Sequence, residues 1–210
     1  MKKLLLTTVI ASLFILPFGP VALADDVSAT EPSVEYVEYI PGAAPALSSS
    51  VDAMTPALHA VLLAMENQRA ESFTTDDPDL AWEMLYNLLS MYGQLDERSS
   101  YEEDVLILPS ETVYDYSAAL FTEMPDPSQL PEALADRMTY DPLTDEFRLI
   151  CGSDGLSEVV ISTTVPSGSD LLVAGSLVYL AEDTQLAAFT ATLSASDNLF
   201  GCTVTDLSVA

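Results

Sequence analysis

The first residue to test for chemistry is His59, the only histidine of the chain, because histidine is the most frequent general base and a common metal ligand. It falls inside a predicted helix, where a lone histidine is more often a surface or core residue than a catalyst. A serine triad would need His59, but the chain contains no G-x-S-x-G elbow. Gly152-Ser153-Asp154-Gly155 has the composition of an ordinary hairpin turn. We therefore expect no catalytic residue built on histidine.

The two cysteines, Cys151 and Cys202, offer a cross-link rather than a nucleophile. An isolated pair in an oxidising compartment most simply forms one disulfide, which we predict here; two reduced core thiols are the alternative. Cysteine–histidine catalysis would need His59 beside one of them, and a disulfide would remove that nucleophile. The chain has no C-x-x-C motif, so a thioredoxin-type role is not expected, and zinc sites built on cysteine need more ligands.

Acidic residues are too numerous to single out a catalytic pair. Glycoside hydrolysis uses two carboxyl groups at a fixed separation, and any two of the 33 acidic residues could qualify. The run Asp76-Asp77-Pro78-Asp79 could attract calcium, but it lacks the spacing of an EF-hand loop and its terminal glutamate. Helix capping explains this run better. The sequence predicts no catalytic, cofactor or metal site.

Aromatic side chains provide the other candidate surface. Trp82 and Tyr92 recur at helical spacing, which is typical of core positions. Tyr86, Tyr114 and Tyr116 are instead expected to be exposed, where their rings could stack on a sugar or a peptide. These three tyrosines are the ligand surface that the sequence predicts.

Residues 1–24 have the pattern of a secretory signal peptide. Lys2 and Lys3 supply a positive start, residues 4–16 are almost entirely apolar, and the sequence up to Ala24 fits signal peptidase. A membrane span needs about 20 apolar residues, and this run is shorter and followed by prolines. We expect cleavage after Ala24, no stable membrane insertion afterwards, and a periplasmic or secreted product.

Removal of this peptide would leave a mature chain without lysine. Four arginines (Arg69, Arg98, Arg137 and Arg148) then face 33 acidic residues, a formal net charge of −29. Nucleic-acid binding depends on neutralising phosphates with Lys and Arg, so no nucleic-acid partner is expected. Schiff-base and P-loop lysine chemistry is excluded in the mature chain, whereas basic partners and cations remain compatible. Acidity also keeps an exported protein soluble.

The remaining organisation suggests a linker and one domain. Residues 25–50 are rich in Pro, Ala, Ser and acidic residues and predict a flexible linker. Within it, residues 34–40 alternate in part and could dock as an edge strand. Residues 51–210 are long enough for a single domain with an ordinary core.

Helix signals concentrate in the first part of that domain. Asp77 is a capping residue before Pro78, and Gly93 follows as a natural stop, so residues 78–92 are predicted to be helical. Weaker start signals predict two more helices, over residues 55–69 and 110–124.

Strand signals follow in the second part. Segments rich in β-branched and apolar residues, separated by short turns, predict strands over residues 147–151, 158–165, 171–180, 186–194 and 199–209. The fold class is therefore α+β, with N-terminal helices (about 55–138) packed on a C-terminal antiparallel β-meander of four to five strands (about 139–210). Residues 171–180 are apolar on both faces, so we expect this strand to be central and covered on two sides. The helices can cover one face, and the other needs the N-terminal segment, sheet curvature or a partner.

Three short patterns carry a family resemblance. The run Trp82-Glu83-Met84-Leu85-Tyr86, followed by Leu108-Pro109-Ser110-Glu111 and Ala119-Leu120-Phe121, resembles a pattern in uncharacterised exported bacterial proteins, many from gut organisms. The resemblance implies export and this architecture, and it supplies no catalytic residues.

These observations favour an exported, acidic, non-enzymatic binding module of the cell envelope whose partner is a protein, a peptide or a glycan. A homodimer is also compatible with the sequence. One alternative is an inhibitor of a basic envelope enzyme, and another, of a different class, is a carboxylate-dependent hydrolase. Two carboxylates with raised pKa values in one pocket would favour the hydrolase, and a broad apolar patch would favour binding.

Overall fold

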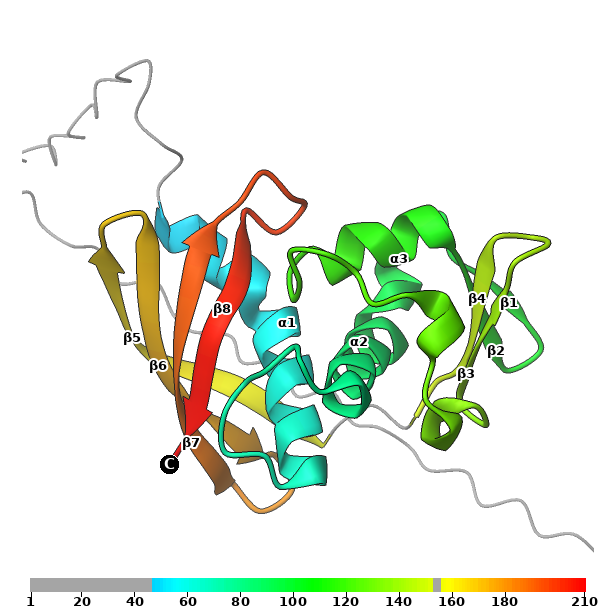
Figure 1. Cartoon of the computed structure of the whole chain (residues 1–210). Helices are drawn as coiled ribbons and strands as arrows, with labels where there is room; N and C mark the ends of the chain where they lie inside the picture. The colour runs from blue at the N-terminus through cyan, green and yellow to red at the C-terminus, as the bar shows by residue number, and fades with distance from the viewer. Residues whose placement is uncertain (1–46, 153–155) are drawn as a thin grey trace, which may run out of the picture. The chain divides into compact units, whose positions relative to one another are not determined.

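The computed structural model describes residues 47–152 and 156–210 (Figure 1). The predicted signal peptide, the segment 34–40 and most of the predicted linker lie outside the described residues. These described ranges contain three α-helices, α1 (Leu47–Gln68), α2 (Pro78–Tyr92) and α3 (Ser110–Ser117). Three short 3₁₀ turns accompany them, at Gly93–Leu95, Pro127–Gln129 and Glu132–Leu134.

Helix α2 begins and ends where its sequence signals predict. The Asp77 side chain accepts hydrogen bonds from the backbone N–H groups of Asp79 (3.0 Å) and Leu80 (3.5 Å), which satisfies donors that have no partner within the helix. Gly93, however, is right-handed, with a φ of −60°. A Cβ there would approach Leu108 Cδ1 to 3.0 Å. Glycine is therefore used at this position for close packing and not for a left-handed turn.

Helix α1 begins at Leu47, well before the start predicted near Thr55, and it contains Pro56. Proline removes one helical hydrogen bond and disfavours the helix around it. The turn before it nevertheless buries Val51 and Met54 completely in the core. Burial of such side chains contributes about 1.5–3 kcal/mol each, so packing outweighs the local preference. Residues 47–50, predicted as linker, are helical for this reason.

The strands form two separate antiparallel sheets. The first, in the order β1-β2-β4-β3, consists of β1 (Ser100–Glu102), β2 (Val105–Pro109), β3 (Met138–Asp141) and β4 (Glu146–Ile150). The second, which we call the C-terminal sheet, is a meander of β5 (Ser157–Ser167), β6 (Asp170–Tyr179), β7 (Thr184–Ala195) and β8 (Cys202–Val209). The predicted α+β class and C-terminal meander are confirmed, whereas the division into two sheets was not predicted. It arises because β4 pairs with β2, a strand that precedes α3 in the chain.

Helix α1 packs along one face of the C-terminal sheet, against β5, β6 and β8, and α2 packs on the other side of α1 (Figure 1). Side chains of β6 that point toward α1, such as Leu171, Val173 and Leu177, are buried. Leu172 points to the opposite face and is 45% exposed. The strand is central, as expected, and α1 covers one of its faces, but the expected cover on the second face is not found among the described residues.

The predicted disulfide between Cys151 and Cys202 is wrong. Cys151 follows β4 of the first sheet, whereas Cys202 begins β8 of the C-terminal sheet, and the structure does not join them. A disulfide needs Cα atoms within about 7 Å of each other. The prediction rested on an oxidising compartment and an isolated pair of cysteines, neither of which brings the two residues together, and the two sheets separate them.

Within the described ranges, no helix is long and apolar enough to cross a membrane.

Gly175 offers a test of the packing of the C-terminal sheet. A Cβ at this position would lie 2.4 Å from the Val160 carbonyl oxygen and 2.9 Å from the ring of Phe189. Gly175→Ala is therefore expected to lower the free energy of unfolding by about 1–3 kcal/mol, measured by urea denaturation. Gly152→Ala is the control, because its Cβ would meet nothing within 4 Å. Equal stability of the two variants would contradict this packing.

Candidate functional site

His59 lies in a buried hydrogen-bonded group that joins α1, α2 and β5. Its Nδ1 is 2.8 Å from the Tyr92 hydroxyl and its Nε2 is 3.0 Å from Ser157 Oγ. The neutral ring has one donor and one acceptor nitrogen, so both contacts are satisfied together. Burial lowers the pKa of His59 and raises that of Tyr92, which keeps the whole group uncharged.

A serine beside a histidine can be a nucleophile and its base, but the surroundings of Ser157 do not support that role. Both Ser157 and His59 are buried, with His59 only 5% exposed. The third member, Tyr92, carries no negative charge that would stabilise an imidazolium. The arrangement is a structural clip between two helices and the C-terminal sheet, in agreement with the sequence expectation for a lone helical histidine.

Tyr86 is buried, so the expectation that it is exposed is wrong. Its hydroxyl donates a hydrogen bond to the Ile150 carbonyl oxygen (2.8 Å), which ties α2 to the end of β4. The Arg137 guanidinium lies 4.6 Å from the centre of its ring, and Arg137 also pairs with Glu83 of α2 (2.8 Å). Glu83 is only 8% exposed. The position of Tyr86 is therefore fixed by packing that no local pattern encodes.

Tyr114 and Tyr116 have opposite surroundings. Tyr114 is exposed, as predicted. Tyr116 is buried; its hydroxyl donates to the Tyr92 carbonyl oxygen at 3.3 Å, and its ring makes an edge contact with Phe200. Only one of the three predicted tyrosines is therefore available to a ligand, and the structure does not bring them together as an exposed surface.

The carboxyl groups with displaced pKa values all move in one direction. The pKa of Asp96 is lowered by its hydrogen bonds with the Arg98 guanidinium, that of Asp126 by the Ser128 backbone N–H, and that of Asp145 by the Ser110 hydroxyl. A general acid at neutral pH needs a raised pKa instead. In the ranges that the structure describes, no cluster of three His, Cys, Asp or Glu side chains could hold a metal ion.

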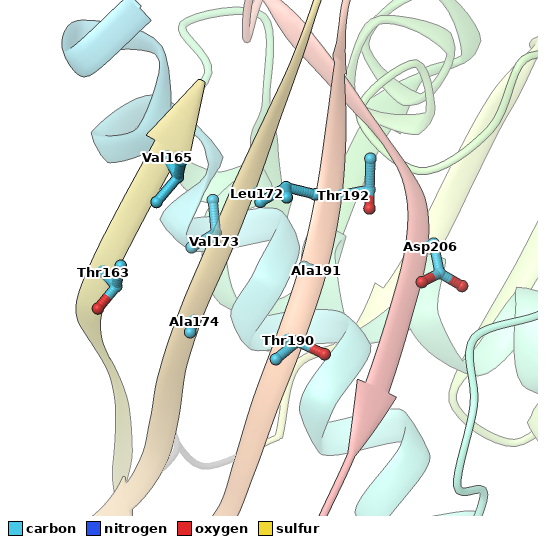
Figure 2. Close-up of a pocket in the computed structure, with 9 residues that line it drawn as sticks. All are labelled: Thr163, Val165, Leu172, Val173, Ala174, Thr190, Ala191, Thr192 and Asp206. Carbon is cyan, nitrogen blue, oxygen red and sulfur yellow. The ribbon is translucent and has the colours of Figure 1, made fainter. Parts of the chain in front are cut away.

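The face of the C-terminal sheet opposite α1, which we call the outer face, is hollowed (Figure 2). One row of facing residues crosses all four strands, with Val165 opposite Leu172, Leu172 opposite Thr192, and Thr192 opposite Asp206. The next row has the small Ala174 at its centre, flanked by Thr163 and Thr190. Small side chains beside larger ones leave a hollow of about 490 Å³.

The outer face is apolar and hydroxyl-bearing in a chain that is otherwise crowded with charge. Leu172 and Val165 are 45% and 49% exposed, and Asp206 is the only charged one of the described residues that line the hollow. Depletion of charge and exposed apolar side chains distinguish interaction surfaces from the rest of a protein surface. The sequence contained one signal for it, the apolar pattern on both faces of residues 171–180, but sequence reasoning placed the ligand surface at the tyrosines.

A second hollow, of about 400 Å³, lies between β8 and the segments around Phe73 and Phe121. Glu123 is the only carboxylate that lines it. Each of these two hollows therefore contains a single carboxylate, whereas hydrolysis of a glycoside by the usual mechanism requires two.

No protein-family model matches this chain, and no match was found among curated proteins.

The His59 clip predicts a pH-dependent contribution to stability. Its pKa is lowered from the ordinary 6.5 in the folded protein, so the unfolded chain takes up a proton first as the pH falls. The stabilisation is therefore complete above pH 6.5 and is lost progressively below it. His59→Gln should cost about 1–3 kcal/mol at neutral pH, and this difference from wild type should shrink toward about pH 5.

Urea denaturation of wild type and His59→Gln across this pH range measures the effect. The comparison of the two proteins cancels the titration of the carboxylates that they share. A difference that stays constant with pH would contradict the buried neutral histidine.

The Glu83–Arg137 pair gives a second prediction. Arg137→Met removes the partner of a carboxylate that is almost fully buried, so it should lower the free energy of unfolding by about 1–3 kcal/mol, a range reduced because Arg137 itself is partly exposed. Arg148→Met is the matched control, since its partner Glu102 is exposed, and should change stability little. Equal effects of the two substitutions, by thermal denaturation, would show that Glu83 does not depend on Arg137.

Proposed function

We propose that this protein is an exported, non-enzymatic binding module of the cell envelope and that it binds its ligand on the outer face of the C-terminal sheet. The observation that carries the proposal is the hollow of the outer face, which is apolar and hydroxyl-lined in a strongly acidic chain and has one charged side chain among the described residues that line it. The export part of the proposal rests on the signal-peptide pattern of residues 1–24.

The chemistry of the described residues supports binding over hydrolysis. The displaced carboxyl pKa values are lowered, and the buried histidine is held neutral by two hydrogen bonds. A surface that binds without reacting needs only shape, apolar area and a few hydroxyl groups. The outer face offers all three.

The negative charge of the chain favours a basic partner. The same charge is compatible with a second candidate function, inhibition of a basic envelope enzyme. Three of the four arginines are in ion pairs with carboxylates, namely Arg98, Arg137 and Arg148. The arginines thus neutralise neighbouring acids, and the field around the protein is negative. Such a field raises the association rate of cationic partners at low salt.

The substitution Leu172→Glu tests this surface, because it places a charge beside the exposed side chain of Val165 on the outer face. The mature chain, immobilised and exposed to envelope extract, is expected to retain one or more partners that the Leu172→Glu variant loses. Leu143→Glu is the matched control, since Leu143 is 94% exposed in the β3–β4 turn, away from the C-terminal sheet.

Retention of the same partners by Leu172→Glu would show that the outer face is not the binding surface. Recovery of no partner at low and at moderate salt would contradict the binding function itself. Circular dichroism of both variants checks that each is folded.

A further inference from the structure

The C-terminal sheet has one edge that the described chain covers and one that it does not. Along β8, the Phe73 N–H donates to the Leu207 carbonyl oxygen (2.7 Å), and the Val204 N–H donates to the Ala119 carbonyl oxygen (2.9 Å). Along β5, the ladder to β6 is the only one formed with described residues. The other side of β5 presents a row of backbone donors and acceptors, which is a template for another strand.

β5 carries few of the features that usually protect such an edge. It has no lysine, and Glu158 is its only charged residue. A bulge lies between Ile161 and Thr163, and Pro166 is near its end; both limit pairing locally. Residues 162–169 are all exposed. Among the residues that the structure describes, none pairs with this edge of β5.

The charged residues around β5 favour a positively charged strand as its partner. No lysine, arginine or histidine follows Arg148 in the sequence, so the C-terminal sheet carries acidic groups and no basic ones. Carboxylates lie near both ends of β5, with Glu158 at its start and Asp170 opposite Ser167 at its end. A second copy of this chain would bring the same sign of charge to the same edge, whereas a cationic segment would be attracted.

We propose that an extended, cationic segment of a partner protein adds to the free edge of β5 as a fifth strand of the C-terminal sheet. Backbone hydrogen bonds supply affinity and alternate side chains supply selectivity in this binding mode. Alternate side chains of the added strand continue the outer face beside Thr163 and Val165. A basic residue at one end lies beside Glu158, and a basic residue at the other end lies beside Ser167, with the Asp170 carboxylate one strand further on. The inference rests on the proposed function and names the partner class for that surface.

A synthetic peptide of about nine residues, with lysine at both ends and alternating valine and threonine between them, matches the length of the accessible edge. Fluorescence anisotropy with the mature chain is expected to show binding that weakens as salt is raised. The same peptide with a central proline, which cannot pair along its length, and a version with glutamate at both ends are expected not to bind.

Two protein variants test the position of the charges. Glu158→Gln should weaken binding of the peptide by about two- to fivefold, the usual effect of an exposed ion pair. Asp170→Asn should weaken it less, because this carboxylate lies one strand further from the added strand. Glu132→Gln and Asp136→Asn are the matched controls, because they remove the same charges beside the first sheet, and should leave the affinity unchanged.

Amide hydrogen exchange locates the added strand. Bound peptide should protect amides in residues 159–165 of β5 and leave those of β8 unchanged. Equal binding of the proline peptide, protection confined to β7 and β8, or no binding of the lysine-ended peptide would each overturn the proposal. So would protection, in the peptide-free monomer, of those β5 amides that point away from β6, which would mean that the chain covers this edge itself. A dimer with the same amides protected would also overturn it.

The two proposals fail separately. If the peptide does not bind while Leu172→Glu still loses an envelope partner, the outer face remains a binding surface and only strand addition is wrong. If Leu172→Glu loses nothing while the peptide protects β5, the edge is the binding site without the outer face.

Discussion

Burial of α1 between the C-terminal sheet and α2 is the constraint on which the rest of the structure depends. From Val51 to Met65, almost every apolar side chain of this helix is buried. A helix with contacts on two sides must supply apolar residues around most of its circumference, and α1 does so at the cost of carrying Pro56 in its interior. His59 adds a directional contact at the same junction, because its two ring nitrogens reach Tyr92 of α2 and Ser157 of β5. The contacts of α1 thus fix the positions of both α2 and the C-terminal sheet.

The same arrangement explains why the candidate surface lies where it does. Helix α1 covers one face of the C-terminal sheet, and no described segment covers the outer face. Leu172 and Val165 are therefore exposed in positions where a strand covered on both faces would bury them. The segments around Phe73 and Ala119 hydrogen-bond with β8 and close that edge, whereas no described segment pairs with the outer edge of β5. An open face and an open edge adjoin each other along β5, in the part of the chain that has no basic residue.

Much of the architecture could be predicted from sequence because it is encoded locally. The cap at Asp77 and Pro78 predicted α2 to the residue, since satisfying the first backbone donors is a matter of neighbouring residues alone. The strands of the meander were predicted within a few residues, because turn-forming residues and β-branched runs alternate along the chain. The start of α1 was predicted incorrectly. The local start signal at Thr55 and Pro56 is outweighed by burial of Val51 and Met54, which depends on residues far away in the sequence.

The candidate surface was less predictable than the fold. Tyr86 and Tyr116 are residues of a type that often lines ligand-binding surfaces. In this fold, however, both are buried: the Tyr86 hydroxyl donates to the Ile150 carbonyl oxygen, and the Tyr116 hydroxyl donates to the Tyr92 carbonyl oxygen. The disulfide prediction failed for a similar reason, because the distance between Cys151 and Cys202 follows from the division of the strands into two sheets.

By itself, the sequence determined the helix and strand pattern, the acidity and the apolar character of both faces of β6. These follow from composition and short-range spacing. Only the tertiary structure decided which face of the C-terminal sheet α1 covers, which edge stays open, and which polar side chains find partners in the core. Those properties depend on contacts between residues that are distant in the chain. Such contacts contribute to the free energy of folding only once the helices and strands pack together.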